Sequence, residues 1–575
     1  MLKTLLKIMK GYGKESVLAP LFKMLEASFE LLIPLVVAAI VDTGIARGDG
    51  KYIVKMCLIM VVLGIIGLVC AVVAQYFAAR VAVGVASRLR HRLMEHILGL
   101  SYTQIDAVGG SAIVTRMTAD VAQIQNGVNL ALRLLLRSPF VVFGAMVMAF
   151  SIDFQSALVF AGVIPVLCLV VFGIMLITMP MYRKAQQSLD GVTSATRQNL
   201  AGVRVLRAFC KEHDEVASYE KATEELTRRQ QIAGRISGLM NPVTFVIINL
   251  AVVLLVKTGA IKVYDGILTQ GMVIALYNYM SQILVELIKM ANLIITMTKA
   301  AVCAGRIESV LELPLEAKDG VKRSAFRGKV EFRDVTAAYE GASEPSLKNI
   351  SFVAHPGQTV GIIGGTGSGK TTLVNLIPAF YQASGGKVLL DGMDVREMDK
   401  DALRKQIGIV PQKAVLFHGT IRENLLWGRE DATDEALWQA LETAQAAQVV
   451  MDKEGELEAP VEQGGTNFSG GQRQRLTIAR ALVRKPAVLI LDDSASALDY
   501  ATDANLRRAI RGMEEPPTTF IVSQRAASVR YADQILVLED GMLAGRGTHE
   551  ELLENCAVYR EIYYSQFPKE VAAHE

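Results

Sequence analysis

The sequence predicts a membrane α-helical protein with a second, α/β domain that binds a nucleotide. The first half of the chain contains six apolar runs of about 20 residues or more, the length needed to cross a bilayer. The second half contains a glycine-rich loop between a short apolar strand and a helix, which is typical of an α/β phosphate-binding fold. With 575 residues, 51% of them hydrophobic, the chain is too long for one core and unusually apolar for a soluble protein.

The predicted spans lie near residues 17–41, 56–79, 131–150, 157–180, 242–264 and 272–297. The connections after the second and fourth spans are long, polar and rich in arginine, so the positive-inside rule places them, and the N-terminus, in the cytoplasm. We expect their helices to continue past the bilayer. The predicted domains are a transmembrane domain at 1–300, a polar linker at 301–327 and a nucleotide-binding domain at 328–575.

The overall charge and the cysteines exclude several classes of protein. A net charge of +3 gives no polyanion-binding signature, so nucleic acid is not an expected partner. The six cysteines have no paired spacing, which argues against a disulfide framework and against a zinc site.

Some charged residues fall inside the predicted spans, where charge is costly. Glu26 and Glu30 are four residues apart and share a helix face in the first span. They could attract a cationic substrate in a central cavity, or they could pair with lysines or lie near the cytoplasmic headgroups. Glu286 and Lys289 lie in the sixth span, and their role stays open.

The glycine-rich loop fits the phosphate-loop pattern G-x-x-x-x-G-K-[ST]. Glycines let consecutive backbone N–H groups turn toward a phosphate, the lysine places an ammonium on the terminal phosphates, and the threonine hydroxyl can ligate Mg²⁺. We therefore expect the chain to bind a nucleoside triphosphate. The loop consists of Gly364, Gly365, Thr366, Gly367, Ser368, Gly369, Lys370, Thr371 and Thr372.

Four further motifs follow the loop. An apolar strand ends before Gln412, which leaves this side chain on a loop near the phosphates. A Ser-Gly-Gly-Gln sequence opens a helix and forms a second anion-binding element. A buried strand ends in Asp492, which is placed to hold Mg²⁺, and another apolar strand ends before Gln524. The Ser-Gly-Gly-Gln element is Ser469, Gly470, Gly471 and Gln472, and Ser496, Ala497, Leu498 and Asp499 follow Asp492.

Taken in order, these motifs resemble those of an ATP-binding cassette (ABC) exporter half-transporter, and the resemblance covers essentially the whole chain. It implies a six-helix transmembrane domain with long cytoplasmic helical extensions, an α/β P-loop domain, and ATP-driven export across the cell (plasma or inner) membrane with Mg²⁺. It implies that Tyr339 stacks on adenine, that Gln412 contacts Mg²⁺ and couples the site to the membrane domain, and that 496–499 is the D-loop. The two long connections contain hairpin tips at 101–106 and 200–209, which could be solvated or could dock on the nucleotide domain. The resemblance implies that both tips are coupling helices.

The resemblance also implies two cassettes packed head to tail, each ATP lying between one phosphate loop and the partner's Ser-Gly-Gly-Gln. Two residues depart from the family pattern, since Asp493 stands where the family usually has Glu and Gln524 where it has His. An aspartate is one methylene shorter, and a glutamine carries neither a proton nor a positive charge. We expect ATP to bind but to be hydrolysed slowly at this degenerate site.

This pattern is similar to that of the degenerate-site half of bacterial heterodimeric multidrug exporters, which favours a second, different half-transporter as the partner. Two alternatives stay open. One is a homodimeric exporter in which Asp493 acts as the base, and the other is an ATP-gated channel or regulatory subunit without productive hydrolysis. The substrate is expected to be hydrophobic or amphipathic, and drugs, lipids and peptides all remain candidates.

Overall fold

The computed structural model describes residues 10–316, 320–323, 326–339 and 341–567, so part of the predicted linker, residues 317–319 and 324–325, lies outside the described residues. The chain forms two compact units. The first, helical unit contains the residues up to Leu98 together with Gly110–Leu313. The second, α/β unit contains Gly99–Gly109 and the chain from Pro314 onward.

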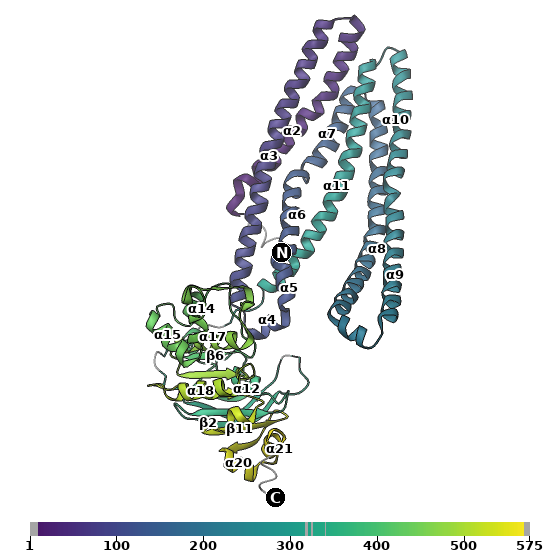
Figure 1. Cartoon of the computed structure of the whole chain (residues 1–575). Coiled ribbons are helices and arrows are strands. Elements are labelled where there is room, and N and C mark those ends of the chain that lie inside the picture. The colour runs from purple at the N-terminus through teal and green to yellow at the C-terminus, as the bar shows by residue number, and fades with distance from the viewer. Residues whose placement is uncertain (1–9, 317–319, 324–325, 340, 568–575) are drawn as a thin grey trace. The chain divides into compact units, whose positions relative to one another are not determined.

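The helical unit is built from long helices (Figure 1). Among its described residues, six helical segments are long and apolar enough to cross a membrane, and each contains one of the predicted spans. At 1.5 Å per residue, the 55 residues of α8 extend about 80 Å, far beyond a hydrocarbon core of about 30 Å, which confirms the predicted extensions. The elements are η1 (Lys10–Tyr12), α2 (Gly13–Ala39), η2 (Ile40–Ile45), α3 (Gly50–Leu98), α5 (Gly110–Thr115), η3 (Arg116–Asp120), α6 (Val121–Leu134), α7 (Arg137–Ile152), α8 (Phe154–Ala208), α9 (Glu212–Gly238), α10 (Met240–Tyr264) and α11 (Gln270–Leu311).

Small residues bring these helices together. In α3 the buried face includes Ala74, Ala78, Ala82 and Ala86, four residues apart, and α3 packs mainly on α2. Such a stripe lets two backbones approach closely where lipid provides no hydrophobic driving force. The opposite face exposes large apolar side chains, as expected of a helix in contact with lipid.

Two helices differ from the predicted boundaries. The polar linker was placed at 301–327, yet α11 continues as a helix to Leu311. Cys303, Ala304, Ile307 and Val310 are buried on one face of that extension, which is the spacing of a helix with one face packed on its neighbours. The third predicted span contains the junction of α6 and α7 at Leu135 and Leu136, where the backbone keeps right-handed helical angles.

The α/β unit contains a six-stranded sheet in the order β12-β11-β3-β10-β9-β6 and a four-stranded antiparallel sheet in the order β2-β1-β4-β5. In the six-stranded sheet only β12 is antiparallel to its neighbour. The strands are β1 (Val330–Ala337), β2 (Leu347–Ala354), β3 (Thr359–Gly364), β4 (Gly385–Leu390), β5 (Met393–Asp394), β6 (Ile407–Val410), β7 (Gly419–Thr420), β8 (Pro460–Val461), β9 (Val488–Asp492), β10 (Thr518–Val522), β11 (Gln534–Glu539) and β12 (Met542–Gly547).

Helices of this unit precede or follow the strands. They are α4 (Tyr102–Val108), α12 (Lys370–Leu376), α13 (Lys400–Lys405), α14 (Ile421–Leu426), α15 (Asp434–Thr443), α16 (Ala447–Met451), η4 (Glu456–Glu458), η5 (Gln463–Gly465), α17 (Gly470–Val483), α18 (Tyr500–Arg511), α19 (Ala526–Val529), α20 (His549–Asn555) and α21 (Ala557–Gln566).

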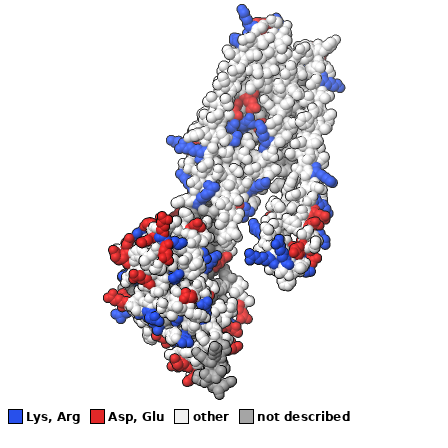
Figure 2. Space-filling view, in the orientation of Figure 1, with Lys and Arg blue, Asp and Glu red and all other residues white. Residues whose placement is uncertain are grey.

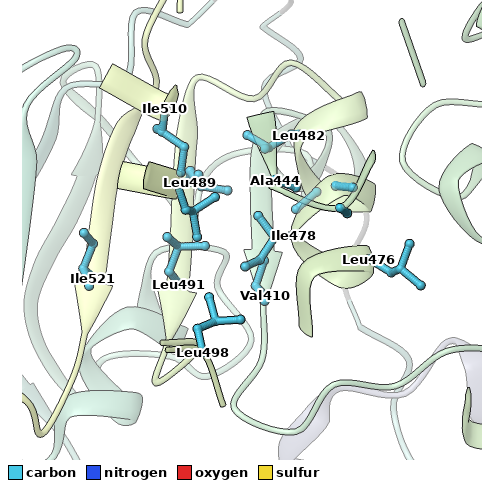
Figure 3. Packing of buried hydrophobic residues seen from close by; sticks show 14 of the residues in the cluster. Val410, Ala444, Leu476, Ile478, Leu482, Leu489, Leu491, Leu498, Ile510 and Ile521 are labelled. Atoms are coloured by element: carbon cyan, nitrogen blue, oxygen red, sulfur yellow. The ribbon is translucent and has the colours of Figure 1, made fainter. Parts of the chain in front are cut away.

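The six-stranded sheet is buried on both faces. In β9, Leu489 and Leu491 pack into a core shared with helices α15, α17 and α18 (Figure 3), whereas Val488 and Ile490 point into a second core shared with the antiparallel sheet. Alternate residues of a strand face opposite sides, so a continuous apolar run is what a doubly covered strand requires. The strand ends that carry the nucleotide motifs are therefore held in a rigid frame.

The first predicted hairpin tip, 101–106, belongs to the α/β unit. The ring of Tyr102 in α4 stacks on that of Phe380 with their centroids 4.2 Å apart. The hydroxyl of Tyr381 donates a hydrogen bond of 2.6 Å to Asp106. The second predicted tip, 200–209, belongs to the helical unit, and there Leu200 and Phe209 are exposed.

Candidate functional site

The predicted motifs meet at one edge of the six-stranded sheet because the strands that precede them are parallel. Along β10, Val522 is in register with Asp492 of β9 on one side and with Ile362 of β3 on the other. Val410, which ends β6, pairs with Leu491. The carboxyl ends of these four strands thus bring together the phosphate loop, Asp492 and the residues that follow Val410 and Val522.

The phosphate loop needs its glycines for close packing and for backbone conformation. At Gly369 the backbone is left-handed with φ of 94°, and a Cβ atom would lie 2.7 Å from the backbone oxygen of Ser346. At Gly364 a Cβ atom would lie 2.1 Å from the backbone oxygen of Leu538. Around Gly365 and Gly367 there is open space, which leaves room for a ligand along the loop.

The ammonium of Lys370 is buried against this loop. It donates hydrogen bonds to the carbonyl oxygens of Gly364 at 3.0 Å and Gly365 at 2.6 Å. Burial lowers the pKa of Lys370, and the carboxylates of Asp493 and Asp492 oppose that shift. The loop therefore holds a cation at the place where the sequence predicts terminal phosphates.

Thr371 and Asp492 lie together, as expected of two residues that share a metal. The Thr371 hydroxyl donates a hydrogen bond of 3.1 Å to Oδ1 of Asp492. Burial raises the pKa of this carboxyl group, as does the neighbouring charge of Asp493, while the bond from Thr371 lowers it. Hydroxyl, carboxylate and amide oxygens are hard ligands that suit Mg²⁺, so the chemistry of Thr371, Asp492 and Gln412 fits that ion.

Asp493 adopts a left-handed backbone conformation, with φ of 47°, directly after β9. Its N–H donates to the carbonyl oxygen of Val522 at 2.9 Å, and its Oδ2 accepts a hydrogen bond of 3.4 Å from Nε2 of Gln412. Gln524 follows β10, and its side chain is exposed. The structure therefore brings Asp493 and Gln412 into contact and places Gln524 on the adjacent strand end.

Ser469 starts the 14-residue helix α17 with a capping box. Its hydroxyl accepts from the N–H of Gln472, whose side chain in turn accepts from the N–H of Ser469. A Cβ atom on Gly471 would lie 3.0 Å from the carbonyl oxygen of Ala497, so α17 begins against the segment that contains Ser496, Ala497, Leu498 and Asp499. Asp499 caps the next helix, α18.

Tyr339 lies beside the phosphate loop. Its hydroxyl is 3.0 Å from Oγ1 of Thr372, and its ring meets that of Tyr381 edge-on with the centroids 5.1 Å apart. The side chain is exposed. The remaining loop residues, Thr366 and Ser368, lie between the glycines already described, and Ser368 accepts a hydrogen bond of 3.4 Å from Lys370.

Glu26 and Glu30 are both paired in the helical unit. Glu26 forms an ion pair of 2.5 Å with Lys23, and Glu30 forms one of 2.6 Å with Arg137 of α7. The same arginine binds Glu286 at 2.6 Å. Arg137 is not among the residues predicted from the sequence, although an arginine within a predicted span is itself a signal.

Comparisons with known proteins agree with this structure. Residues 16–287 match the model of the ABC transporter transmembrane region, and residues 347–496 match the ABC transporter model. An uncharacterized ABC transporter ATP-binding protein of Mycobacterium tuberculosis is 37% identical over 97% of both chains. The Bacillus subtilis ABC transporter ATP-binding protein YfiB, also uncharacterized, is 34% identical over 98% of both chains.

A third relative, an ATP-dependent lipid A-core flippase of Hahella chejuensis, is 30% identical over 86% of this chain and 84% of its own length. The six membrane-spanning segments and the α/β unit with its phosphate loop are thus joined in one chain, as in these relatives. The chain therefore belongs to the ABC transporter family, as an ATP-hydrolysing, multi-pass membrane half-transporter of the exporter type with a cytoplasmic nucleotide-binding domain.

Proposed function

We propose that this chain is one subunit of a heterodimeric exporter, in which it supplies a degenerate ATP site and the signature element of its partner's site. One observation carries the proposal: Asp493 follows Asp492 at the end of β9, where the family resemblance implies a catalytic carboxylate and usually a glutamate. A general base must lie within about 3 Å of the water that it activates. The shorter side chain retracts the carboxylate by more than about 1 Å, and a displacement of that size costs about 10²-fold in rate.

The surroundings of Asp493 support the same conclusion. Its carboxylate accepts a hydrogen bond from Gln412, so one oxygen is already engaged. Gln524, on the neighbouring strand end, can donate a hydrogen bond to a phosphate but cannot carry a positive charge. The shorter carboxylate at 493 and the uncharged side chain at 524 both weaken hydrolysis at the same ATP site. A homodimer would contain two such weakened sites.

Binding of ATP itself is retained. The glycine loop, Lys370 and the pair Thr371–Asp492 have the arrangement that holds a triphosphate, and Mg²⁺ bound there would neutralise phosphate charge. The capping box at Ser469 fixes the N-terminus of α17, which can then bind the phosphates of the ATP held by the partner. The chain thus binds one ATP tightly and helps to complete the other site.

In this scheme ATP binding closes the two cassettes, and the hairpin tips pass that movement to the spans. The contact of Tyr102 with Phe380 connects the first tip to the cassette. Hydrolysis in the partner's site then resets the cycle, while ATP retained at the degenerate site keeps the cassettes associated. The substrate is a hydrophobic or amphipathic compound, which is in keeping with the lipid A-core flippase among the relatives.

The lifetimes of nucleotide at the two sites test this function. The assembled transporter is loaded with radiolabelled ATP, separated from free nucleotide, and sampled for ATP and ADP over time. Asymmetric sites predict one rapidly hydrolysed ATP and one that survives many turnovers. Equal decay of both would contradict the proposal and favour two competent sites.

A further inference from the structure

A chain of alternating charges connects three membrane helices. Glu30 on α2 binds Arg137 on α7, Arg137 binds Glu286 on α11, and Glu286 binds Lys289 at 2.8 Å on the same helix. The hydroxyl of Ser138 adds a hydrogen bond of 2.8 Å to Glu286. Figure 2 shows a group of acidic and basic side chains midway along the helical unit, on a surface that is otherwise almost uncharged there.

The two outer side chains of this charge network are exposed, and the two inner side chains are buried. The side chains of Arg137 and Glu286 are 7% and 4% exposed, whereas those of Glu30 and Lys289 are 40% and 42% exposed. A purely structural ion pair has no need of open ends. Here the negative Glu30 and the positive Lys289 are exposed on either side of the buried pair of Arg137 and Glu286.

The charges lie at membrane depth. At 1.5 Å per residue, Glu30 lies about 14 Å from Ala39 at the end of α2, and Glu286 lies about 24 Å from Gln270 at the start of α11. Both residues fall inside the predicted spans, 17–41 and 272–297, and a hydrocarbon core is about 30 Å thick. Ionised groups at such a depth face protein or a water-filled space and mark functional sites.

Arg137 and Ser138 begin α7, next to the junction with α6 at Leu135 and Leu136, where the backbone keeps right-handed helical angles. A buried arginine on a membrane helix is itself typical of a functional site. Moreover, the Nε of Arg137 is buried and has no hydrogen-bond partner among the described residues, so the arginine keeps unused donor capacity.

We propose that this charge relay, Glu30–Arg137–Glu286–Lys289, binds a zwitterionic amphiphile whose headgroup carries an ammonium and a phosphate or carboxylate. The ammonium meets Glu30 and the anion meets Lys289, which continues the alternation of charge. This inference rests on the proposed export function and names the class of its substrate. It replaces the cationic substrate considered for Glu26 and Glu30, because Lys23 neutralises Glu26 and Arg137 pairs with Glu30.

The charge balance of the cluster explains why a zwitterion is preferred to a simple cation or an apolar compound. Three acids, Glu26, Glu30 and Glu286, stand with three bases, Lys23, Arg137 and Lys289, so the cluster has no net charge to attract a simple cation. An apolar substrate would remove water from Glu30 and Lys289 and return no hydrogen bonds, which is costly. A zwitterion would replace the lost water with hydrogen bonds to both Glu30 and Lys289.

Competition binding tests the proposal with the full-length chain in an uncharged maltoside detergent, since all four residues belong to this chain and no hydrolysis is required. The probe is dodecylphosphoethanolamine with a fluorophore at the end of its alkyl chain, followed by anisotropy. The competitors are dodecylphosphoethanolamine, dodecylammonium and dodecyl phosphate, which share one alkyl chain. The zwitterion is expected to compete at about tenfold lower concentration than either other compound, the effect of one further charged hydrogen bond.

Variants show which end recognises which charge. Glu30→Gln should abolish the advantage of the zwitterion over dodecyl phosphate and keep its advantage over dodecylammonium, while Lys289→Gln should do the reverse. Glu30→Asp and Lys289→Arg keep the charges and should keep both preferences. Lys51→Gln and Glu212→Gln, at exposed positions outside the relay, are the matched controls. Each conclusion uses the ratio of competitors within one variant, so it does not depend on the folded fraction.

Several results would overturn the proposal. Equal competition by all three compounds would show binding through the alkyl chain alone, and dodecylammonium competing as well as the zwitterion would show a cation site. Ratios that stay unchanged in Glu30→Gln and Lys289→Gln would place binding elsewhere, as would no displaceable binding at all. Phosphoethanolamine without a chain should not compete. Because these results do not depend on hydrolysis, they are separate from the outcome of the nucleotide-lifetime measurement.

Discussion

Nε2 of Gln412 donates a hydrogen bond of 3.4 Å to Oδ2 of Asp493, although 81 residues separate the two in the chain. They meet because β6 and β9 are parallel neighbours and each residue follows the carboxyl end of its strand. The amide that the family resemblance assigns to coupling thus contacts the residue that stands where the resemblance implies a catalytic glutamate. A glutamate at 493 would place its carboxylate one methylene further from the backbone than this contact.

Restoring the usual residues should restore hydrolysis. We expect Asp493→Glu combined with Gln524→His to raise the ATPase rate of the chain purified alone by about 10- to 100-fold, because the longer carboxylate recovers its reach and the imidazole can bind a phosphate oxygen. Steady-state phosphate release at saturating Mg-ATP measures the effect.

The matched control for backbone strain is Asp540→Glu. Asp540 has φ of 45°, close to the 47° of Asp493, and lies in the turn between β11 and β12. Aspartate is better tolerated than longer side chains in this left-handed region, so both glutamates carry a similar cost in stability. A rise in ATPase activity in the control, or none in the double variant, would contradict the account.

Asp492 should make the nucleotide-free protein less stable as the pH rises. Burial raises the pKa of this carboxyl, so its contribution to stability is present at low pH and lost as the pH rises through the folded-state pKa. Asp492→Asn is uncharged at every pH and its oxygen can still accept from Thr371. Its Tm should exceed that of the wild type at pH 7, by a margin that shrinks toward pH 4, while the stabilisation by Mg-ATP is reduced. A margin that grows on acidification would disprove the electrostatic explanation.

Tyr102 should matter for coupling. Its stacked contact with Phe380 is worth about 0.5–1.5 kcal/mol beyond the area that it buries. Tyr102→Ala should therefore lower transport more than ATP hydrolysis in the assembled transporter, measured as substrate moved per ATP in proteoliposomes. Tyr264→Ala removes an exposed ring at the end of α10 and should leave this ratio unchanged. Equal loss of transport and hydrolysis would show a defect in the nucleotide site instead.

The nucleotide-binding features were the most predictable part of the chain. A phosphate loop, an aspartate after a buried strand and a serine before a helix are local patterns, and parallel strands carry them to one edge without further information. The spans were equally clear because every turn of a lipid-facing helix is apolar. The assignments of individual roles to these residues remain predictions.

Contacts between distant segments could not be predicted in the same way. The ion pairs of Arg137 join residues more than 100 positions apart, and nothing local in the sequence indicates that one arginine would meet both Glu30 and Glu286. The extension of α11 to Leu311 was not predicted because Gly305, Arg306 and Glu308 interrupt its apolar residues and a polar segment follows. The stacking of Tyr102 on Phe380 depends likewise on how the chain folds back.

Asp120 should stabilise the helical unit through Arg306. The carboxylate in η3 is almost fully buried and accepts two hydrogen bonds from the guanidinium of Arg306 in α11. Asp120→Asn should destabilise the protein by about 1–2 kcal/mol, since half of the arginine remains in water. Thermal unfolding in detergent measures the shift. Asp214→Asn breaks the exposed pair with Lys211 and should have almost no effect; a loss as large as that of Asp120→Asn would contradict the role of burial.

The ATPase activity of this chain alone, compared with that of the same chain co-purified with a candidate partner half-transporter, tests the central claim most directly. The account predicts little activity alone and strong activity in the pair. In the pair, the partner supplies a phosphate loop with an intact catalytic carboxylate, and Ser469–Gln472 of this chain completes that site. Strong activity of the chain alone would show that Asp493 and Gln524 are competent, and would contradict the degenerate site.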